Sequence, residues 1–189
     1  MKASTTLTNA FSKTTNQEIL KIISAIFALI AQSAECREDL IINSCIEECV
    51  RIYKKVDADD VKLIFVRVLA NLSENDLGLN KIKRLGVVNM LQDAIKDCRQ
   101  KNLLYHFIMA FLLFSKDQEL YRLMMKNKLL TMLENVSFSA IKDSENLTAL
   151  LYGFNLFSKR ATESNLSELF LVFIFFISKK QKIIILEFI

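Results

Sequence analysis

The sequence is marked first by what it lacks: its 189 residues include no proline, no tryptophan and only three glycines. Proteins built from strands and tight turns use proline and glycine often, so this scarcity favours an all-helical fold. The chain also has a single histidine and four cysteines without a CxxC pair. Zinc sites and Cys/His or Ser/His/Asp catalysis need several such side chains together. We therefore expect no enzyme activity, no bound metal and no cofactor.

The remaining composition is that of a globular protein, with 52% hydrophobic and 24% charged residues. The formal net charge of +4 is a mild surplus with both signs interspersed, which disfavours a dedicated nucleic-acid binder. The basic residues Lys81, Lys83 and Arg84 alternate with apolar ones. We expect them to form a solvated face, with an acidic or nucleic-acid partner as the lesser alternative.

The cysteines favour an intracellular protein. Cys45 and Cys49 lie four residues apart on a predicted helix, and we expect them, with Cys36 and Cys98, to be small buried thiols. Residues 1–16 contain no apolar core of a signal peptide. A reducing compartment is therefore expected, and we favour the cytoplasm over a cilium or the nucleus.

Residues 1–15 are mostly small and polar, with Leu7 and Phe11 as isolated apolar positions. We expect a polar N-terminal tail there, or alternatively the remnant of a preceding helix. Thr15 and Glu18 have the spacing of a capping box, which predicts the start of a long helix. Apolar residues then recur at helical spacing, namely Ile19, Ile22, Ile23, Ile26, Phe27 and Ile30.

Acidic residues mark the start of another long helix further along the chain. Asp57, Asp59 and Asp60 directly precede a second apolar stripe. Carboxylates at such a position cap free amide groups and interact favourably with the helix dipole. We therefore interpret these residues as caps and dipole partners rather than as metal ligands.

The apolar pattern returns at a fixed interval. Three successive shifts, of 42, 42 and 43 residues, align the chain with itself. The aligned residues are Phe27, Leu69, Phe111 and Phe154 in one column and Ile30, Leu72, Phe114 and Phe157 in another. His106 is the equivalent of Ile64, so we expect a core or half-buried histidine. A period near 42 is typical of helical solenoids of the armadillo and HEAT types.

The middle copy of this repeat resembles the armadillo family most closely. The residues that match the family's pattern are Leu69, Ala70, Asn71, Leu72, Ser73, Asn80, Ile82, Gly86, Val87, Val88 and Leu91. The resemblance implies an all-α fold, a right-handed α-α superhelix of about three and a half repeats over residues 16–168. The family's turn glycine is Gly86 here, whereas the neighbouring copies have Ser44 and Lys128.

The resemblance also implies where a partner would bind. The third helix of each armadillo repeat lines a concave face, and members that bind extended peptides carry a ladder of asparagines on it. This chain has Asn71 at one such position and leucine at the equivalents Leu29, Leu113 and Leu156. Importin-like carriers also place a tryptophan one turn earlier, and its absence disfavours a nuclear-signal receptor.

Helical spacing and the repeat together define a candidate groove. Arg67 and Asn71 lie one turn apart on one face of a predicted helix. The candidate partner-binding residues are Arg67, Asn71, Met109, Leu113, Tyr152 and Leu156. Such a surface suits an amphipathic helix of a partner better than an extended basic peptide. Alternatively, the apolar members of this set pack against further repeats.

The composition changes after Ser167. Leu169 to Ile177 are nine consecutive apolar residues, and a lysine cluster at 179–182 follows them. A membrane-spanning helix needs about twenty apolar residues, so this segment is too short. Three interpretations of residues 169–189 stay open: a non-native C-terminus that truncates a longer array, an apolar cap on the last repeat, or a membrane-surface anchor.

The sequence therefore predicts a non-enzymatic scaffold for protein–protein interaction, with a helix or peptide of a partner held on the concave face. The first alternative is a structural or assembly subunit of a larger complex, for example a ciliary or cytoskeletal one. A nucleic-acid-binding helical repeat is less favoured, as is a protein that uses residues 169–189 to associate with a membrane.

Overall fold

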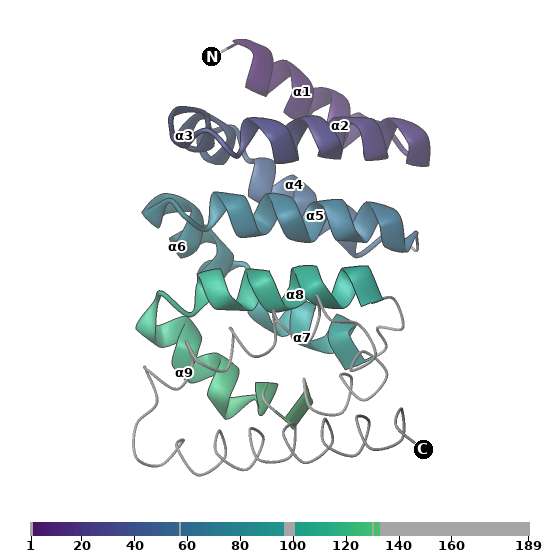
Figure 1. Ribbon diagram of the computed structural model, residues 1–189. Coiled ribbons are helices and arrows are strands. Elements are labelled where there is room, and N and C mark those ends of the chain that lie inside the picture. The colour runs from purple at the N-terminus through teal and green to yellow at the C-terminus, as the bar shows by residue number, and fades with distance from the viewer. Residues whose placement is uncertain (1, 57, 97–100, 130, 133–189) are drawn as a thin grey trace, which may run out of the picture.

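The computed structural model describes residues 2–56, 58–96, 101–129 and 131–132 (Figure 1). Every regular element in these ranges is an α-helix, which confirms the predicted all-helical fold for this part of the chain. The helices are α1 (Lys2–Lys13), α2 (Gln17–Ile30), α3 (Ala34–Ile42), α4 (Cys45–Tyr53), α5 (Asp59–Leu72), α6 (Asp76–Arg84), α7 (Val87–Lys96), α8 (Lys101–Phe114) and α9 (Gln118–Lys126). The predicted repeat sequence beyond residue 132 and the apolar segment 169–189 lie outside the described residues.

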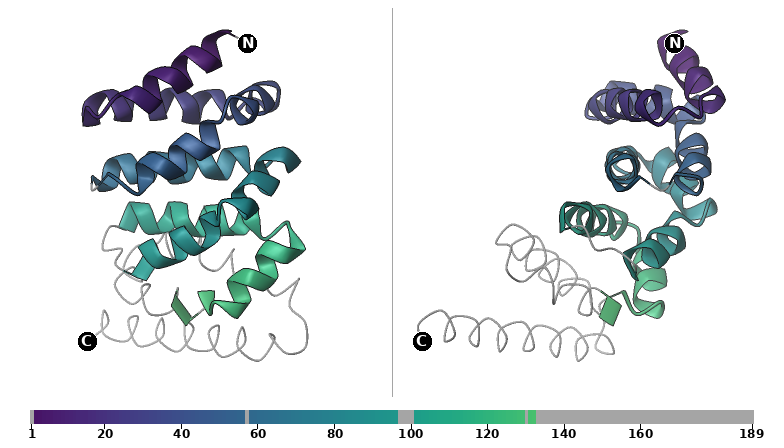
Figure 2. Two further views of the ribbon diagram at one scale, coloured as in Figure 1. Left: turned by 180° about the vertical axis from the view of Figure 1, so that it is seen from behind. Right: turned by 90° about the vertical axis from the view of Figure 1, so that its right-hand side faces the viewer.

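The helix boundaries repeat along the chain. Helices α2, α5 and α8 are each 14 residues long and begin at residues 17, 59 and 101, which are 42 residues apart. Helices α3, α6 and α9 begin at residues 34, 76 and 118, again 42 apart. Figure 1 shows α2, α5 and α8 side by side in one row. Figure 2 shows α1, α4 and α7 in a second row behind them.

The core follows the same interval. Phe27, Leu69 and Phe111 occupy equivalent positions of α2, α5 and α8, and each is 0% exposed. Full burial of an apolar side chain of this size contributes about 1.5–3 kcal/mol relative to its exposure. Because each long helix buries the same side, the stacked layers share one continuous core.

Residues 2–13 form a helix, so for this segment the expected polar tail is wrong and the alternative, a preceding helix, is present. Phe11 of α1 is 0% exposed and packs edge-to-face against Phe27 and Phe65, with ring centroids 5.2 and 5.7 Å away. The polar side of α1 is also used, because Thr5 Oγ1 donates a hydrogen bond to Asn43 Oδ1 at 2.6 Å. The aromatic contacts explain why so polar a segment is held in place.

Helix α2 begins one residue later than the predicted capping box requires. The N-cap is Asn16, whose Oδ1 accepts hydrogen bonds from the amides of Glu18 at 2.9 Å and Ile19 at 3.3 Å. Asparagine is a strong N-cap residue because its short side chain reaches these free amides. The predicted cap at Thr15 is therefore wrong.

The acids at the start of α5 are dipole partners, and one of them also binds a free amide of the first turn, because Asp60 Oδ1 accepts a hydrogen bond from the amide of Val61 at 2.9 Å. The N-cap position is Ala58, which has no side-chain acceptor, and Asp59 and Asp60 lie in the first turn of the helix. There a carboxylate interacts favourably with the helix dipole. Asp60 also forms an ion pair with Lys21 of α2 at 2.6 Å. Asp57 lies outside the described residues.

One residue in each of three equivalent turns has a left-handed backbone. These residues are Ser44, Gly86 and Lys128, with φ values of 64°, 66° and 57°. They follow α3, α6 and α9, and they are 42 residues apart. The turn expected at Gly86 is thus present in all three copies, although only one copy has glycine.

None of the helices that the structure describes combines the length and apolar character that crossing a membrane requires.

Candidate functional site

The structure describes four of the six candidate groove residues, namely Arg67, Asn71, Met109 and Leu113. Arg67 is exposed, and the other three are half-buried. Arg67 and Asn71 lie on α5, and their equivalents Met109 and Leu113 lie on the neighbouring helix α8. Tyr152 and Leu156 lie outside the described residues. We call the surface formed by the exposed sides of α2, α5 and α8 the row face.

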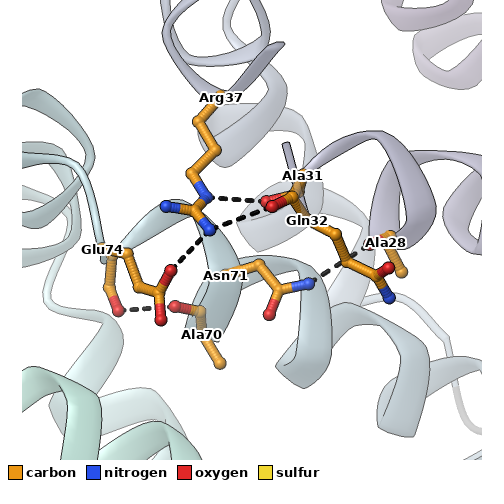
Figure 3. A network of polar contacts seen from close by, with 8 residues as sticks. Ala28, Ala31, Gln32, Arg37, Ala70, Asn71 and Glu74 are labelled. Carbon is orange, nitrogen blue, oxygen red and sulfur yellow. Dashed lines mark hydrogen bonds and ion pairs between the residues drawn. The ribbon is translucent and has the colours of Figure 1, made fainter. Parts of the chain in front are cut away.

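Asn71 ties two layers together. Its side-chain Nδ2 donates a hydrogen bond to the backbone oxygen of Ala28 at 3.2 Å. Ala28 lies in the last turn of α2, where backbone carbonyls lose their intrahelical partners. The contact is drawn in Figure 3. The asparagine that resembles a ligand-binding rung therefore has a partner within the fold.

Arg37 completes a polar network beside Asn71 (Figure 3). Its Nε donates to the carbonyl of Ala31 at 2.7 Å and its Nη2 to that of Gln32 at 3.1 Å. The same guanidinium lies 2.5 Å from the carboxylate of Glu74, in the next layer. Basic side chains near a helix C-terminus satisfy its last carbonyls, so Arg37 both caps α2 and joins it to the following repeat.

Arg67 has no acidic partner among the residues that the structure describes. The charge of Arg67 acts on His106 of α8, whose ring packs edge-to-face on Tyr105 at a centroid distance of 5.2 Å. Burial, and secondly the charge of Arg67, lower the pKa of His106 to about 4. His106 is half-buried as expected, and it is neutral at pH 7. His106 therefore adds no positive charge to the row face, whereas Arg67 does.

Two apolar residues of α2 belong to the row face although the sequence pattern grouped Ile22 with the buried stripe. Ile22 is 59% exposed and Leu29 is 66% exposed. Leu29 is the equivalent of Asn71 and Leu113, so the row face is apolar on both sides of α5. The exposure of Ile22 could have been predicted from the width of the apolar stripe in residues 19–30. One side of a helix cannot bury isoleucines over so wide an arc.

The basic residues of α6 are not simply a solvated face. Lys81 pairs with Glu47 at 2.6 Å and donates to the carbonyl of Ile41 at 2.8 Å. Lys83 lies 2.8 Å from Asp117 and 2.8 Å from Glu119, at the start of α9. The predicted solvated face was wrong for these two lysines, because stacking brings acids of the adjacent layers within reach.

Lys83 also affects the acid that caps α9. Asp117 Oδ1 accepts hydrogen bonds from the amides of Glu119 and Leu120, each at 2.9 Å. Burial alone would raise the pKa of Asp117, but the hydrogen bond from Lys83 and those from the amides outweigh it and lower this pKa. Asp117 therefore stays charged and anchors the α6–α9 contact.

Two of the described cysteines are buried, and one of them, Cys49, has an unreactive thiol. Cys45 and Cys49 are each 0% exposed, whereas Cys36 is exposed, contrary to the expectation for it. The hydrogen bond with Cys45 and then burial raise the pKa of Cys49 well above its ordinary value. A thiol of this kind stays protonated, so it is neither a nucleophile nor a ready metal ligand. Cys98 lies outside the described residues.

A polar hollow of about 410 Å³ lies between α7 and α9, apart from the row face. Asn127 spans it, with Nδ2 donating to Asn89 Oδ1 at 2.9 Å and to Gln92 Oε1 at 3.0 Å. None of the four described groove residues lines it. These amide contacts join the layers of α7 and α9.

Comparison with known proteins bears on the fold alone. No protein-family model matches the chain, and no curated protein sequence matches it. The crystal structure of an engineered protein from the Northeast Structural Genomics Consortium is similar, with a TM-score of 0.62 and 13% sequence identity. The match covers 89% of this chain and 78% of that chain. At this identity the likeness shows that the helical arrangement recurs in a solved structure, and it carries nothing about function.

Proposed function

We propose that this chain is a non-enzymatic protein-interaction scaffold of the armadillo type. In this proposal α2, α5 and α8 are third helices on the inner side of a right-handed superhelix, and a helix of a partner lies across the row face. The observation that carries the proposal is the exposed Arg67, without an acidic partner in the described part of the chain and flanked by the apolar residues Leu29, Met109 and Leu113. The 42-residue spacing of the helix starts supports the repeat assignment.

The chemistry of the row face favours a helix over an extended peptide. An extended peptide needs a series of side-chain amides to bind its backbone, but Asn71 is engaged with Ala28 and its equivalents are Leu29 and Leu113. Apolar patches around one charge instead match an amphipathic helix whose apolar side includes one acidic residue. Charge complementarity at Arg67 would then set the orientation of that helix.

The experiment compares affinity isolation from native cells with three baits: wild type, Arg67→Glu and Arg84→Glu. Arg84 is also exposed and lies at the end of α6, so it is a matched charge-reversal control. We expect Arg67→Glu alone to lose the partner, and a compensating Glu→Arg change in the partner helix to restore it. Equal recovery with all three baits would remove the row face as the binding site and favour the assembly role.

The basic run on α6 and the free thiols bear on the alternatives. The nucleic-acid-binding alternative is less well supported, because Lys81 and Lys83 of the basic run are already paired with acids of neighbouring layers. We also propose a cytoplasmic or other reducing location. The free thiols of Cys36, Cys45 and Cys49 support that location.

A further inference from the structure

Equivalent positions of the three long helices differ sharply in exposure at one edge of the row. Ile19 of α2 is 45% exposed, whereas its equivalents Val61 of α5 and Leu103 of α8 are 2% and 4% exposed. Ile26 is half-buried, although its equivalent Val68 is 0% exposed. An identical helix side is therefore covered in two layers and open in the first.

Ile30 continues this edge. It is half-buried, whereas Leu72 and Phe114, its equivalents in the next two layers, are each 0% exposed. In Figure 1, α2 lies above α5 and α5 above α8. Helix α1 is drawn above α2 there, but the side view in Figure 2 shows it in the row of α4 and α7, so no described helix lies beyond α2 in its own row. We call Ile19, Ile26 and Ile30 the edge surface. It is the repeat–repeat interface of this protein, left without its covering helix in the described part of the chain.

The molecule itself shows what kind of helix covers this interface. Lys21 of α2 pairs with Asp60 of α5 at 2.6 Å, and the carbonyl of Ala28 accepts from Asn71 of α5 at 3.2 Å. Both contacts place one side of α2 against α5. Ser24 and Ala31 lie on that same side by helical spacing and are each 0% exposed. Small side chains on α2 thus allow it to pack closely against the larger apolar side chains at the edge of α5.

The second interface repeats this chemistry. Val66, Ala70 and Ser73 are the equivalents on α5 of Ser24, Ala28 and Ala31, and all three are buried. Because α5 packs on α8 as α2 packs on α5, we infer that these three residues lie on the side of α5 toward α8, whose edge has the buried residues Leu103 and Phe114. A covering helix in this protein therefore has small or β-branched side chains at the spacing i, i+4 and i+7.

We propose that the edge surface binds a helix of a partner protein that presents small residues at this spacing, with a basic residue three positions before the first of them. The basic residue is specified by Glu18, because Glu18 is the equivalent of Asp60, the partner of Lys21. Glu18 is exposed, and no described residue forms an ion pair with it. If the partner helix packs on α2 in the same way that α2 packs on α5, its basic side chain lies next to Glu18, just as Lys21 lies next to Asp60.

A second copy of this chain does not supply that helix through α2. The small side of α2 already packs on α5 within the same molecule, where Ser24 is 0% exposed and Ala28 is 5% exposed. Two copies could meet only edge to edge, isoleucine against isoleucine. That arrangement leaves Glu18 without a basic partner, so the charge favours a different protein.

The test uses a fluorescent peptide of residues 16–33 as the probe. This peptide contains the side of α2 that packs on α5, with Lys21, Ser24, Ala28 and Ala31. Its residues Ile19, Ile22, Ile26 and Ile30 are replaced by glutamine, which keeps the peptide soluble and helix-forming. Binding to the full chain is measured by fluorescence anisotropy. We expect saturable binding that Ile19→Arg weakens by about tenfold or more, since burying an unpaired charge is costly.

Two comparisons make the result specific. Ile42→Arg is the matched control, because Ile42 is 65% exposed on α3 and lies outside the edge surface. It should leave binding unchanged. Glu18→Lys should weaken binding of the probe, and a probe carrying Lys21→Glu should restore it. Recovery by this charge exchange also supports the proposal if Ile19→Arg fails to fold.

Three outcomes would overturn the proposal. The first is no saturable binding to the wild-type chain. The second is an equal loss with Ile42→Arg, which would indicate general hydrophobic adhesion. The third is a wild-type dimer in sedimentation velocity that Ile19→Arg converts to a monomer, because a second copy would then occupy the edge surface. The row-face experiment is independent, since Arg67→Glu leaves the edge surface intact.

Discussion

The three left-handed turns predict that replacing Ser44 by glycine stabilises the protein. Ser44 has φ 64° and Gly86, its equivalent, has φ 66°. A side chain in this conformation costs about 1–2 kcal/mol, because Cβ crowds the following carbonyl oxygen. Glycine in turn lowers the stability by about 0.4–1 kcal/mol, because it gives the unfolded chain more conformational freedom. We therefore expect Ser44→Gly to raise the free energy of unfolding by about 0.5–1 kcal/mol.

The reverse change isolates the conformational cost. Apart from its chain neighbours, no heavy atom lies within 4 Å of the position that a Cβ on Gly86 would occupy, so Gly86→Ala introduces no clash with the rest of the fold. Its expected cost of about 1 kcal/mol is that of the left-handed backbone alone. Lys128→Gly should resemble Ser44→Gly. The two gains should add, because the sites are two repeats apart and share no partner.

Urea denaturation measures these differences as shifts in the midpoint at constant slope. For a chain of this size, 1 kcal/mol corresponds to about 2–4 °C in Tm. Ser33→Gly is the matched control, since Ser33 has an ordinary φ of −79° and its side chain makes no capping hydrogen bond. That change should be neutral or slightly destabilising. If Ser44→Gly and Ser33→Gly behave alike, the left-handed conformation is not what sets the stability of this turn.

Three further predictions concern single side chains. Arg37→Ala should cost about 1–3 kcal/mol in urea denaturation, because two carbonyls at the end of α2 lose their donor; Glu74→Gln keeps both hydrogen bonds and should cost less. Gly78→Ala should cost more than Gly86→Ala, about 3 kcal/mol or more by the same measurement, since its Cβ would lie 2.0 Å from a backbone oxygen of α5. For His106, whose folded pKa is about 4, the unfolded chain binds its proton first as pH falls below about 6.5. Stability should therefore fall between pH 6.5 and 4 by about 1 kcal/mol, after the full shift is discounted for solvent screening of a half-exposed ring, and His106→Gln should remove this part of the pH dependence.

The sequence predicts the layers well because they depend on local periodicity. The apolar columns through Phe27, Leu69 and Phe111 place the long helices, and Gly86 marks a turn. The turn at Ser44 follows the same path because the interval between helices, rather than the glycine, determines the corner. The repeat period therefore predicts the position of this turn, whereas the residue type at position 44 does not.

Local periodicity left the N-terminal helix only as an alternative to a polar tail. Its sequence is dominated by small polar residues, so neither a wide apolar stripe nor a strong cap marks it. What holds it is Phe11, which inserts between Phe27 and Phe65 from two different layers. Contacts of this kind depend on tertiary packing, and local propensity gives no sign of them.

The ion pairs between layers were likewise beyond reach of local patterns. Arg37 contacts Glu74, and Lys83 contacts Asp117, across separations of about one repeat. Charged residues at such distances meet only once the layers are stacked. The period of 42 residues places successive layers side by side, but it does not state which charged side chains meet, because the paired residues are 34 and 37 positions apart rather than one full period.

The groove residues are divided by the structure into two kinds, and this division can be tested. Asn71 is half-buried and donates to the end of α2, so Asn71→Ala should lower the free energy of unfolding by about 1 kcal/mol. Arg67 is exposed and has no acidic partner in the described ranges, so Arg67→Glu should leave stability within about 0.5 kcal/mol of wild type. Binding should respond in the opposite order. If Asn71→Ala abolishes partner binding without loss of stability, the amide is a recognition group, and the helix-docking interpretation of the row face fails.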